Sequence, residues 1–145
     1  MRVQIRECQL DDLSAISKLS KEELGYDYPP ELLKEKLERL LGDRGHRIFV
    51  AVVDGAVAGY IRANDYDVLY APSMKNILGI AVSSSYRRTG LGRSLMDAVV
   101  SWARETDASG IRLVSGEARA GAHEFYRHYG FTCEKKQLNF HLTLK

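Results

Sequence analysis

The segment with the clearest chemical potential is a turn rich in arginine and glycine that lies between two apolar stretches. The apolar run 77–82 predicts an interior strand, and the spacing of apolar residues over 91–102 predicts a helix. Unpaired N–H groups at a helix start favour an anion, and glycines let a ligand approach the backbone closely. Three arginines and no acidic residue lie between Tyr86 and Ser94. The turn is therefore predicted to bind a pyrophosphate or bisphosphate.

Two common phosphate-binding motifs do not describe this turn. The P-loop requires a lysine that is absent here, and the dinucleotide fingerprint requires Gly or Ala where Leu95 stands. Taken by itself, the turn is better interpreted as a helix start with solvated surface arginines, because such turns are common.

Two stretches of the second half resemble the signature motifs of the GCN5-related N-acetyltransferase (GNAT) family. Residues 87–92, RRTGLG, match the family pattern Q/R-x-x-G-x-G/A, and residues 80–82, IAV, stand where the family has its splayed fourth strand. Residues 122–131, AHEFYRHYGF, resemble the second hallmark, A-x-x-F-Y-x-x-x-G-F. The order and separation of the motifs agree with the family, so the resemblance implies both a fold and a cofactor.

The fold that the resemblance implies is of the α/β (α+β) class, with a mixed central sheet of about six to seven strands, about four helices and a splay after the fourth strand. Backbone groups of the fourth strand would hydrogen-bond the pantetheine arm of acetyl-CoA, and amides of the turn would hold its pyrophosphate. The cofactor-binding residues expected from the resemblance are Ile80, Ala81, Val82, Arg87, Arg88, Thr89, Gly90, Leu91, Gly92, Arg93 and Ser94.

Tyr126 matches the family tyrosine that hydrogen-bonds the thioester sulfur and can protonate the departing thiolate. A phenol with a reference pKa of about 10 stays protonated at neutral pH and can donate to a thiolate whose conjugate acid has a pKa of about 8.5. The other interpretation is a core aromatic on an amphipathic helix, a role that Phe125 fills better because it has no polar group. The resemblance implies direct transfer to a primary amine in a ternary complex, without a cysteine nucleophile.

The general base cannot be carried over from the family. Leu78 and Gly79 stand where many members have an acidic residue on the fourth strand. This departure keeps an alternative function open, a non-catalytic acyl-CoA-binding regulatory domain of the same fold. Other candidate bases, each more often a solvated surface group than a catalyst, are Glu23, Asp27, Asp65, Asp67, Glu117 and His123.

The acceptor, a small-molecule or peptide amine, is expected at the loop between the first two helices. Tyr26 and Tyr28 could line a pocket there, and Asp27 could attract a cationic amine, although tyrosines beside prolines are also ordinary loop packing. Arg119 stands where many members have asparagine, and its surroundings resemble a subgroup that includes aminoalkylphosphonate acetyltransferases. An arginine there could bind an anion or form a surface ion pair.

Composition sets the outer limits of these interpretations. A length of 145 residues predicts a single domain, 1–145, and a net charge of +2 argues against a globally basic nucleic-acid binder. The two cysteines and the histidines show no metal-ligand spacing, so no metal is expected. The sequence has no signal-like start and no apolar window of about 20 residues. We therefore expect a cytoplasmic protein that binds neither membrane nor nucleic acid.

The elements that must position the site follow from apolar periodicity and turn residues. Strands are predicted around Val3 and Ile5 and at 48–53, 57–61, 77–82, 111–114 and 138–144. Helices are predicted to start at Asp11 or Asp12 and at Pro29 and Pro30, and to span 91–102 and 122–129. Asp54-Gly55 predicts a tight hairpin turn. The order is β-α-α-β-β-β-α-β-α-β-β, and the apolar last strand is a plausible edge for a homodimer.

Overall fold

The computed structural model describes residues 1–133 and 135–145. They form two compact units, residues 1–114 and the rest of the chain. Two short 3-10 helices span Leu10–Asp12 and Ser84–Tyr86. The main elements are β1 (Val3–Glu7), α1 (Leu13–Leu24), α2 (Pro30–Leu41), β2 (His46–Val53), β3 (Ala56–Tyr66), β4 (Met74–Val82), α3 (Leu91–Glu105), β5 (Ile111–Leu113) and α4 (Ala120–Tyr129).

The sheet of the first unit has the order β1-β2-β3-β4-β5, antiparallel except for the parallel pair β4 and β5. The predicted hairpin is confirmed, since β2 and β3 are joined at Asp54 and Gly55, whose φ angles are 49° and 88°. Positive φ at both positions is what a tight hairpin turn requires, and Asp-Gly tolerates it. The hairpin places two long central strands beside β4.

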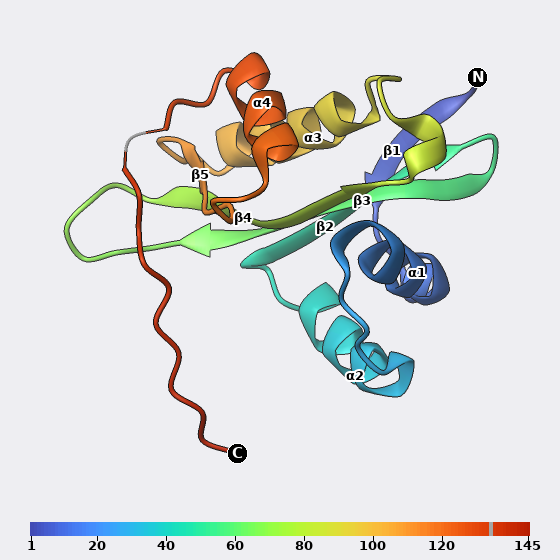
Figure 1. The fold of residues 1–145 in the computed structure, drawn as a ribbon, viewed down its shortest axis with the longest axis horizontal. Helices are drawn as coiled ribbons and strands as arrows, with labels where there is room; N and C mark the ends of the chain where they lie inside the picture. The colour runs from blue at the N-terminus through green and yellow to red at the C-terminus, as the bar shows by residue number, and fades with distance from the viewer. Residues whose placement is uncertain (134) are drawn as a thin grey trace. The chain divides into compact units, whose positions relative to one another are not determined.

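Helices cover both faces of this sheet (Figure 1), with α1 and α2 on one face and α3 on the other. Leu95, Met96 and Val99 of α3 are fully buried. Gly59 of β3 allows α3 to approach, because a Cβ there would stand 3.0 Å from the Ala81 carbonyl oxygen and 3.3 Å from Leu95 Cδ1. The core on the α1 and α2 face consists of Cys8, Ile16, Leu19, Leu37, Ile48, Val50, Tyr60 and Ala81.

The second unit consists of α4 and its flanking segments. The helix ends at Gly130, which has a φ of 127°, and the Phe131 N–H then donates to the Tyr126 carbonyl at 3.0 Å. A glycine with positive φ is a common helix terminator, as the sequence predicts. Beyond the helix, residues 131–133 and 135–145 contain neither helix nor strand.

The predicted fold class is confirmed, but the predicted number of strands is wrong. The described residues form five strands and four main helices instead of six to seven strands and four helices. Residues 138–144 are not a strand, and their apolar side chains are between 81% and 88% exposed. Alternation alone does not make a strand, because the backbone groups also need a neighbouring strand to pair with. One domain over 1–145 stays a prediction.

No helix formed by the described residues is both long and apolar enough to cross a membrane.

Candidate functional site

The outer edge of β4 changes from paired to open halfway along the strand. On one side β4 pairs with β3 as far as Val82, whereas on the other side it pairs with β5 only from Lys75 to Ile77. Among the described residues, 78–82 therefore have no strand partner on the β5 side, which is the splay expected after the fourth strand. Backbone groups on such an edge can pair with an extended ligand in the manner of an added strand. The predicted residues Ile80, Ala81 and Val82 lie on this edge.

The turn that follows β4 has a backbone shaped for close approach. Arg88 and Gly90 both have positive φ angles, 63° and 87°, and Gly90 is the N-cap of α3. The Thr89 hydroxyl donates to the Tyr86 carbonyl, which closes the turn. The first turn of α3 contains no acidic residue. Its N–H groups have no carbonyl four residues earlier in the helix, so the positive end of the helix dipole is available to an anion.

Glu23 of α1 anchors this turn, a contact that the local sequence does not indicate. Its carboxylate accepts hydrogen bonds from the Ser84 N–H at 3.2 Å and from Arg87 Nη2 at 2.9 Å. The Glu23 side chain is only 9% exposed, whereas that of Arg87 is 66% exposed. Arg87 is thus held by an acid 64 positions away in the sequence, and Glu23, one of the candidate bases, is engaged in holding the turn.

Tyr126 lies in α4, in the second unit. It is half-buried, and its ring packs edge-on against those of Phe125 and Phe131, with centroids 5.6 Å and 5.9 Å away. Burial raises the pKa of Tyr126, and the positive charge of Arg119 opposes that rise. Because burial disfavours the phenolate, the hydroxyl keeps its proton at neutral pH and can donate it.

The expected acceptor residues of the first loop lie at the surface. Tyr26 is 67% exposed, and Tyr28 packs its ring 4.7 Å from Lys36 Nζ. Asp27 faces Lys21 at 3.9 Å, and both of these side chains are exposed. The fourth candidate, Arg119, is the N-cap residue of α4 in the second unit. The three loop residues adjoin one another, but none of them is enclosed.

The other candidate bases have partners, and none stands out as a base. Asp65 pairs with Lys75, Asp67 accepts a hydrogen bond from Ser73, and Glu117 pairs with Lys136 at 3.2 Å. His123 Nε2 lies 2.9 Å from the Gly116 carbonyl oxygen. On β4, Leu78 is apolar and 48% exposed, and Gly79 has no side chain. The described residues therefore do not identify which side chain, if any, acts as the general base.

The buried thiol of Cys8 is unsuited to nucleophilic catalysis by its environment. Cys8 is buried, and burial raises its pKa to about 12. Its thiolate, the nucleophilic form, is therefore not populated at neutral pH. Cys133 is exposed and free. In the part of the chain that the structure describes, no group of three or more His, Cys, Asp or Glu side chains is arranged to hold a metal ion.

A groove of about 400 Å³ lies elsewhere in the first unit, between β1, β2 and α3. Its lining includes both partners of the Arg47–Glu7 ion pair and Trp102, whose ring lies 5.6 Å from the Arg47 guanidinium carbon. It shares only Ser94 with the predicted cofactor residues. The groove is thus separate from the open edge of β4.

Comparisons with known proteins agree with this geometry. Residues 13–131 match the Acetyltransferase (GNAT) family. A protein named N-alpha-acetyltransferase from Saccharolobus solfataricus is 31% identical over 101 residues, which are 65% of this chain and 58% of that protein. One with the same name from Sulfurisphaera tokodaii is 29% identical over 135 residues, 88% of this chain and 78% of that protein. The chain thus spans little more than half the length of the first relative.

A solved structure extends the likeness to almost the whole chain. The enzyme AAC(6')-Iy, in complex with the bisubstrate analogue CoA-S-monomethyl-acetylneamine, has a TM-score of 0.89 at 19% sequence identity. The match covers 99% of this chain and 100% of that one. At this level of identity, the likeness establishes the fold.

Proposed function

Because the chain belongs to the GNAT acetyltransferase family, we propose that it is an acetyl-CoA-dependent N-acetyltransferase acting on a primary amine of a small molecule or peptide. The observation that carries the proposal is the open edge of β4 at 78–82, followed directly by the Gly90 turn and the unpaired amides of α3. The names of the two relatives and the CoA-containing analogue bound to AAC(6')-Iy support it.

The two halves of the donor molecule require different chemistry, and this chain offers both. Backbone groups of residues 80–82 would pair with the amides of the pantetheine arm. The amides of residues 88–94 would hold the pyrophosphate, with Arg88 and Arg93 adding positive charge. Arg87 would act from the rim of the turn, since Glu23 already binds its guanidinium. Acetyl-CoA supplies the acetyl group as an activated thioester.

The transfer step would be direct. The amine nitrogen forms a bond to the acyl carbon, the bond between carbon and sulfur breaks, and Tyr126 gives its hydroxyl proton to the departing sulfur. A β4 amide, that of Val82, would polarise the thioester carbonyl, and the enzyme would hold both reactants together. The raised pKa of Cys8, about 12, supports a path without an acyl-cysteine.

The absence of a clear base favours an amine that loses its proton easily. A lysine-like amine with a pKa of about 10.4 costs about 4 kcal/mol to deprotonate at pH 7.5, whereas an α-amino group has a pKa of about 7.7–8.0 and costs well under 1 kcal/mol. An α-amine therefore needs no strong base. This argument agrees with the names of the two relatives.

The alternative is a regulatory domain that binds acyl-CoA without acetylating anything. Leu78 and Gly79 favour it, because neither can take a proton from an amine. Tyr126 counts against it, since a pure binding module has no need of a phenol near the sulfur. Residues 1–145 as one domain, a homodimer, a cytoplasmic location and the lack of membrane or nucleic-acid partners all stay predictions.

Two measurements separate these functions. In a thermal-shift assay, acetyl-CoA at about 100 times its Kd should stabilise the protein by about 2.7 kcal/mol, and the absence of a shift at saturation would contradict both functions. A panel of primary amines, followed by release of free thiol, distinguishes them. Turnover identifies an acetyltransferase, whereas binding without turnover of any amine identifies the regulatory domain.

Tyr126→Phe tests the acid. We expect kcat to fall by about 100-fold with the KM for acetyl-CoA nearly unchanged, because general acid catalysis contributes about 10²–10⁴-fold. Since burial raises the pKa of Tyr126, wild-type kcat should decline on the alkaline side only above about pH 10, and the variant should lack that decline. Tyr129→Phe, in the same helix, is the matched control. Wild-type kcat in Tyr126→Phe would refute the assignment.

A further inference from the structure

Arg62 of β3 is a cation for which the described residues provide no counter-charge. It lies on the sheet face covered by α1 and α2, the same face as Tyr60, because alternate residues of a strand share a face. The Tyr60 hydroxyl marks that face through its 2.7 Å hydrogen bond with Ser20 of α1. Arg62 is partly buried, and its Nε is fully buried without a hydrogen-bond partner. Within residues 1–133 and 135–145, no carboxylate pairs with its guanidinium.

A second arginine makes the charge imbalance larger. Burial lowers the pKa of Arg62, and the positive charge of Arg39 in the last turn of α2 lowers it further. Arginine nevertheless stays ionised at neutral pH, because its unperturbed pKa is far above that range. Buried or half-buried charges are normally paired, since an unpaired one loses hydration without compensation. Two arginines that repel each other, with no acid paired to Arg62 among the described residues, are therefore expected to bind an anion.

There is open space beside Arg62. Its register partner on β4 is Gly79, and paired residues of adjacent strands face the same side of a sheet. No heavy atom lies within 4 Å of the point where a Cβ of Gly79 would stand. Gly79 directly precedes residues 80–82, which carry the open edge. The free space and the unpaired guanidinium thus lie side by side.

The position also suits an acceptor. Val82 pairs with Gly59, which lies three residues along β3 from Arg62. At ~3.3 Å per residue, the backbone of Val82 is therefore about 10 Å along the sheet from that of Arg62. An arginine side chain spans part of this distance. An acceptor whose amine lies at the thioester, near Val82, and whose anionic group is several bonds away could reach the Arg62 guanidinium.

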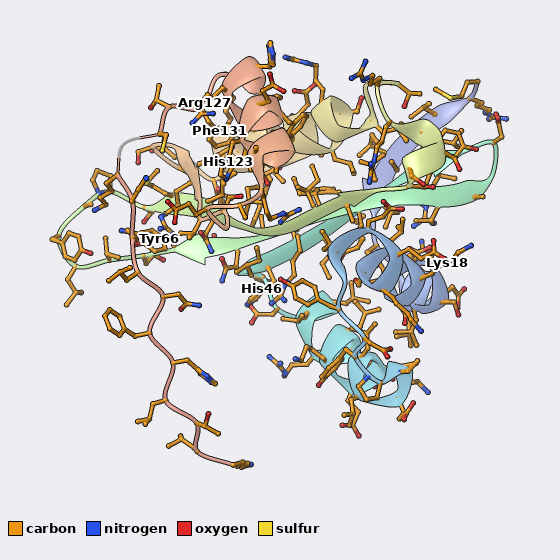
Figure 2. The ribbon with its side chains drawn as sticks, viewed as in Figure 1. Lys18, His46, Tyr66, His123, Arg127 and Phe131 are labelled. Carbon is orange, nitrogen blue, oxygen red and sulfur yellow. The ribbon has the colours of Figure 1, made fainter. Side chains whose placement is uncertain are left out.

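Arg112 provides an instructive contrast on the same face. Its Nη1 donates to Asn76 Oδ1 at 2.7 Å, and its guanidinium carbon lies 4.2 Å from the centroid of the Tyr66 ring. Figure 2 shows Tyr66 at the end of β3 and His46 at the start of β2. Arg112 therefore has partners within the fold, whereas the part of the chain that the structure describes offers none to the Arg62 guanidinium.

Building on the acetyltransferase function proposed above, we propose that Arg62, assisted by Arg39, binds an oxyanion of the acceptor. The substrate class is then an amine that also carries a carboxylate or a chemically similar group. Two sources share this chemistry, a small amino acid and the acidic first residue of a peptide.

Paired acceptors of nearly equal size test the proposal. β-Alanine is compared with β-alaninamide, and Asp-Ala-Ala-amide with Asn-Ala-Ala-amide, by kcat/KM at saturating acetyl-CoA. We expect the wild type to prefer the acid of at least one pair by tenfold or more, since a hydrogen bond to a charged group contributes roughly that factor. The pair that shows the preference identifies the source.

Three variants assign the preference to residues. Arg62→Gln should reduce it at least tenfold through KM, and Arg39→Gln, at an exposed position, should reduce it less. Arg104→Gln, at the exposed end of α3, is the matched control and should leave it unchanged. Arg62→Met should unfold at a urea concentration no lower than the wild type, because the variant no longer carries the desolvation cost of an unpaired, partly buried charge. A merely structural Arg62 would instead give a clear loss of stability.

A binding measurement keeps the inference distinct from the proposed function. N-acetyl-β-alanine and its amide are titrated into the CoA-saturated protein by calorimetry. Tighter binding of the acid that Arg62→Gln abolishes supports the subsite even if no amine is turned over, which would contradict only the enzyme. Equal use of acid and amide by the wild type, together with equal binding of the two probes, overturns the anion subsite while leaving the acetyltransferase standing.

Discussion

Arg6 and Arg62 are partly buried arginines of the same sheet, yet their surroundings are opposite. Arg6 of β1 donates two hydrogen bonds to Asp12, at 2.8 Å and 2.9 Å, and this contact raises the pKa of the arginine and lowers that of Asp12. Arg62 of β3 has no acidic partner among residues 1–133 and 135–145, and burial lowers its pKa. The fold neutralises one cation and leaves the other without a partner.

The difference separates structural charge from charge reserved for a ligand. Asp12, which is 7% exposed, also accepts a hydrogen bond from the Gln9 N–H at 2.8 Å, so the Arg6–Asp12 pair ties β1 to the start of α1. Both oxygens of that carboxylate accept hydrogen bonds within the fold. An unpaired guanidinium beside open space makes no comparable contribution, and it costs stability unless a ligand completes it.

Asp12→Ala should give the largest effect, because it converts Arg6 into an unpaired cation like Arg62. We expect a loss of about 2–3 kcal/mol in the free energy of unfolding, measured in urea, since breaking a largely buried ion pair also leaves the Gln9 N–H without an acceptor. Asp11→Ala, at the exposed neighbouring position, is the control and should stay within about 0.5 kcal/mol. Equal losses of stability in the two variants would contradict the claim that the Arg6–Asp12 pair stabilises the fold.

Acid should produce a smaller version of the same effect. The folded-state pKa of Asp12 lies below its unfolded value, so its contribution to stability is complete above the unfolded pKa of about 3.9 and is lost as pH falls through the folded one. Unfolding free energies measured from pH 6 to pH 2 should therefore decline below pH 4. Asp12→Asn should show a shallower decline, whereas Arg62→Met should follow the wild type. Parallel curves for Asp12→Asn and the wild type would contradict the assignment.

The two regions also differ in how well the sequence predicts them. The turn between β4 and α3 could be predicted as a structural feature because its signals are local: two glycines, three arginines and the adjoining strand and helix patterns all lie within 77–102. Its binding of a pyrophosphate stays a prediction. The hairpin at Asp54 and Gly55 could be predicted for the same reason. The contact of Glu23 with the turn could not, because it joins residues 61 and 64 positions apart. Their proximity is a property of the assembled α1 and β4.

Arg62 and residues 138–144 show two different limits of prediction from sequence: the first is not predicted as a site, and the second is predicted as a strand that the structure does not contain. Nothing in the sequence distinguishes Arg62 from the other arginines, since a missing partner is visible only once the neighbours of a side chain are known. Residues 138–144 have the alternation of a strand, but pairing depends on a neighbour that local pattern does not supply. The prediction of that strand failed because period-2 alternation is necessary for a half-buried strand and not sufficient.

Gly79→Asp would supply Arg62 with the acid that Arg6 already has, and we expect the smallest change in stability from it. The φ angle of Gly79 is not positive and the space beside it is open, so a side chain fits the backbone there. The new carboxylate, on the same face as Arg62, should form an ion pair and stabilise the fold by up to about 1 kcal/mol in urea unfolding. It should also reduce the preference for acidic over neutral acceptors by about tenfold, because the guanidinium would be occupied. Gly79→Asn has nearly the same shape without the charge, so it separates volume from electrostatics and should retain more of the preference. If Gly79→Asp kept the full preference for acidic acceptors, Arg62 would not be the group that binds the acceptor's anion.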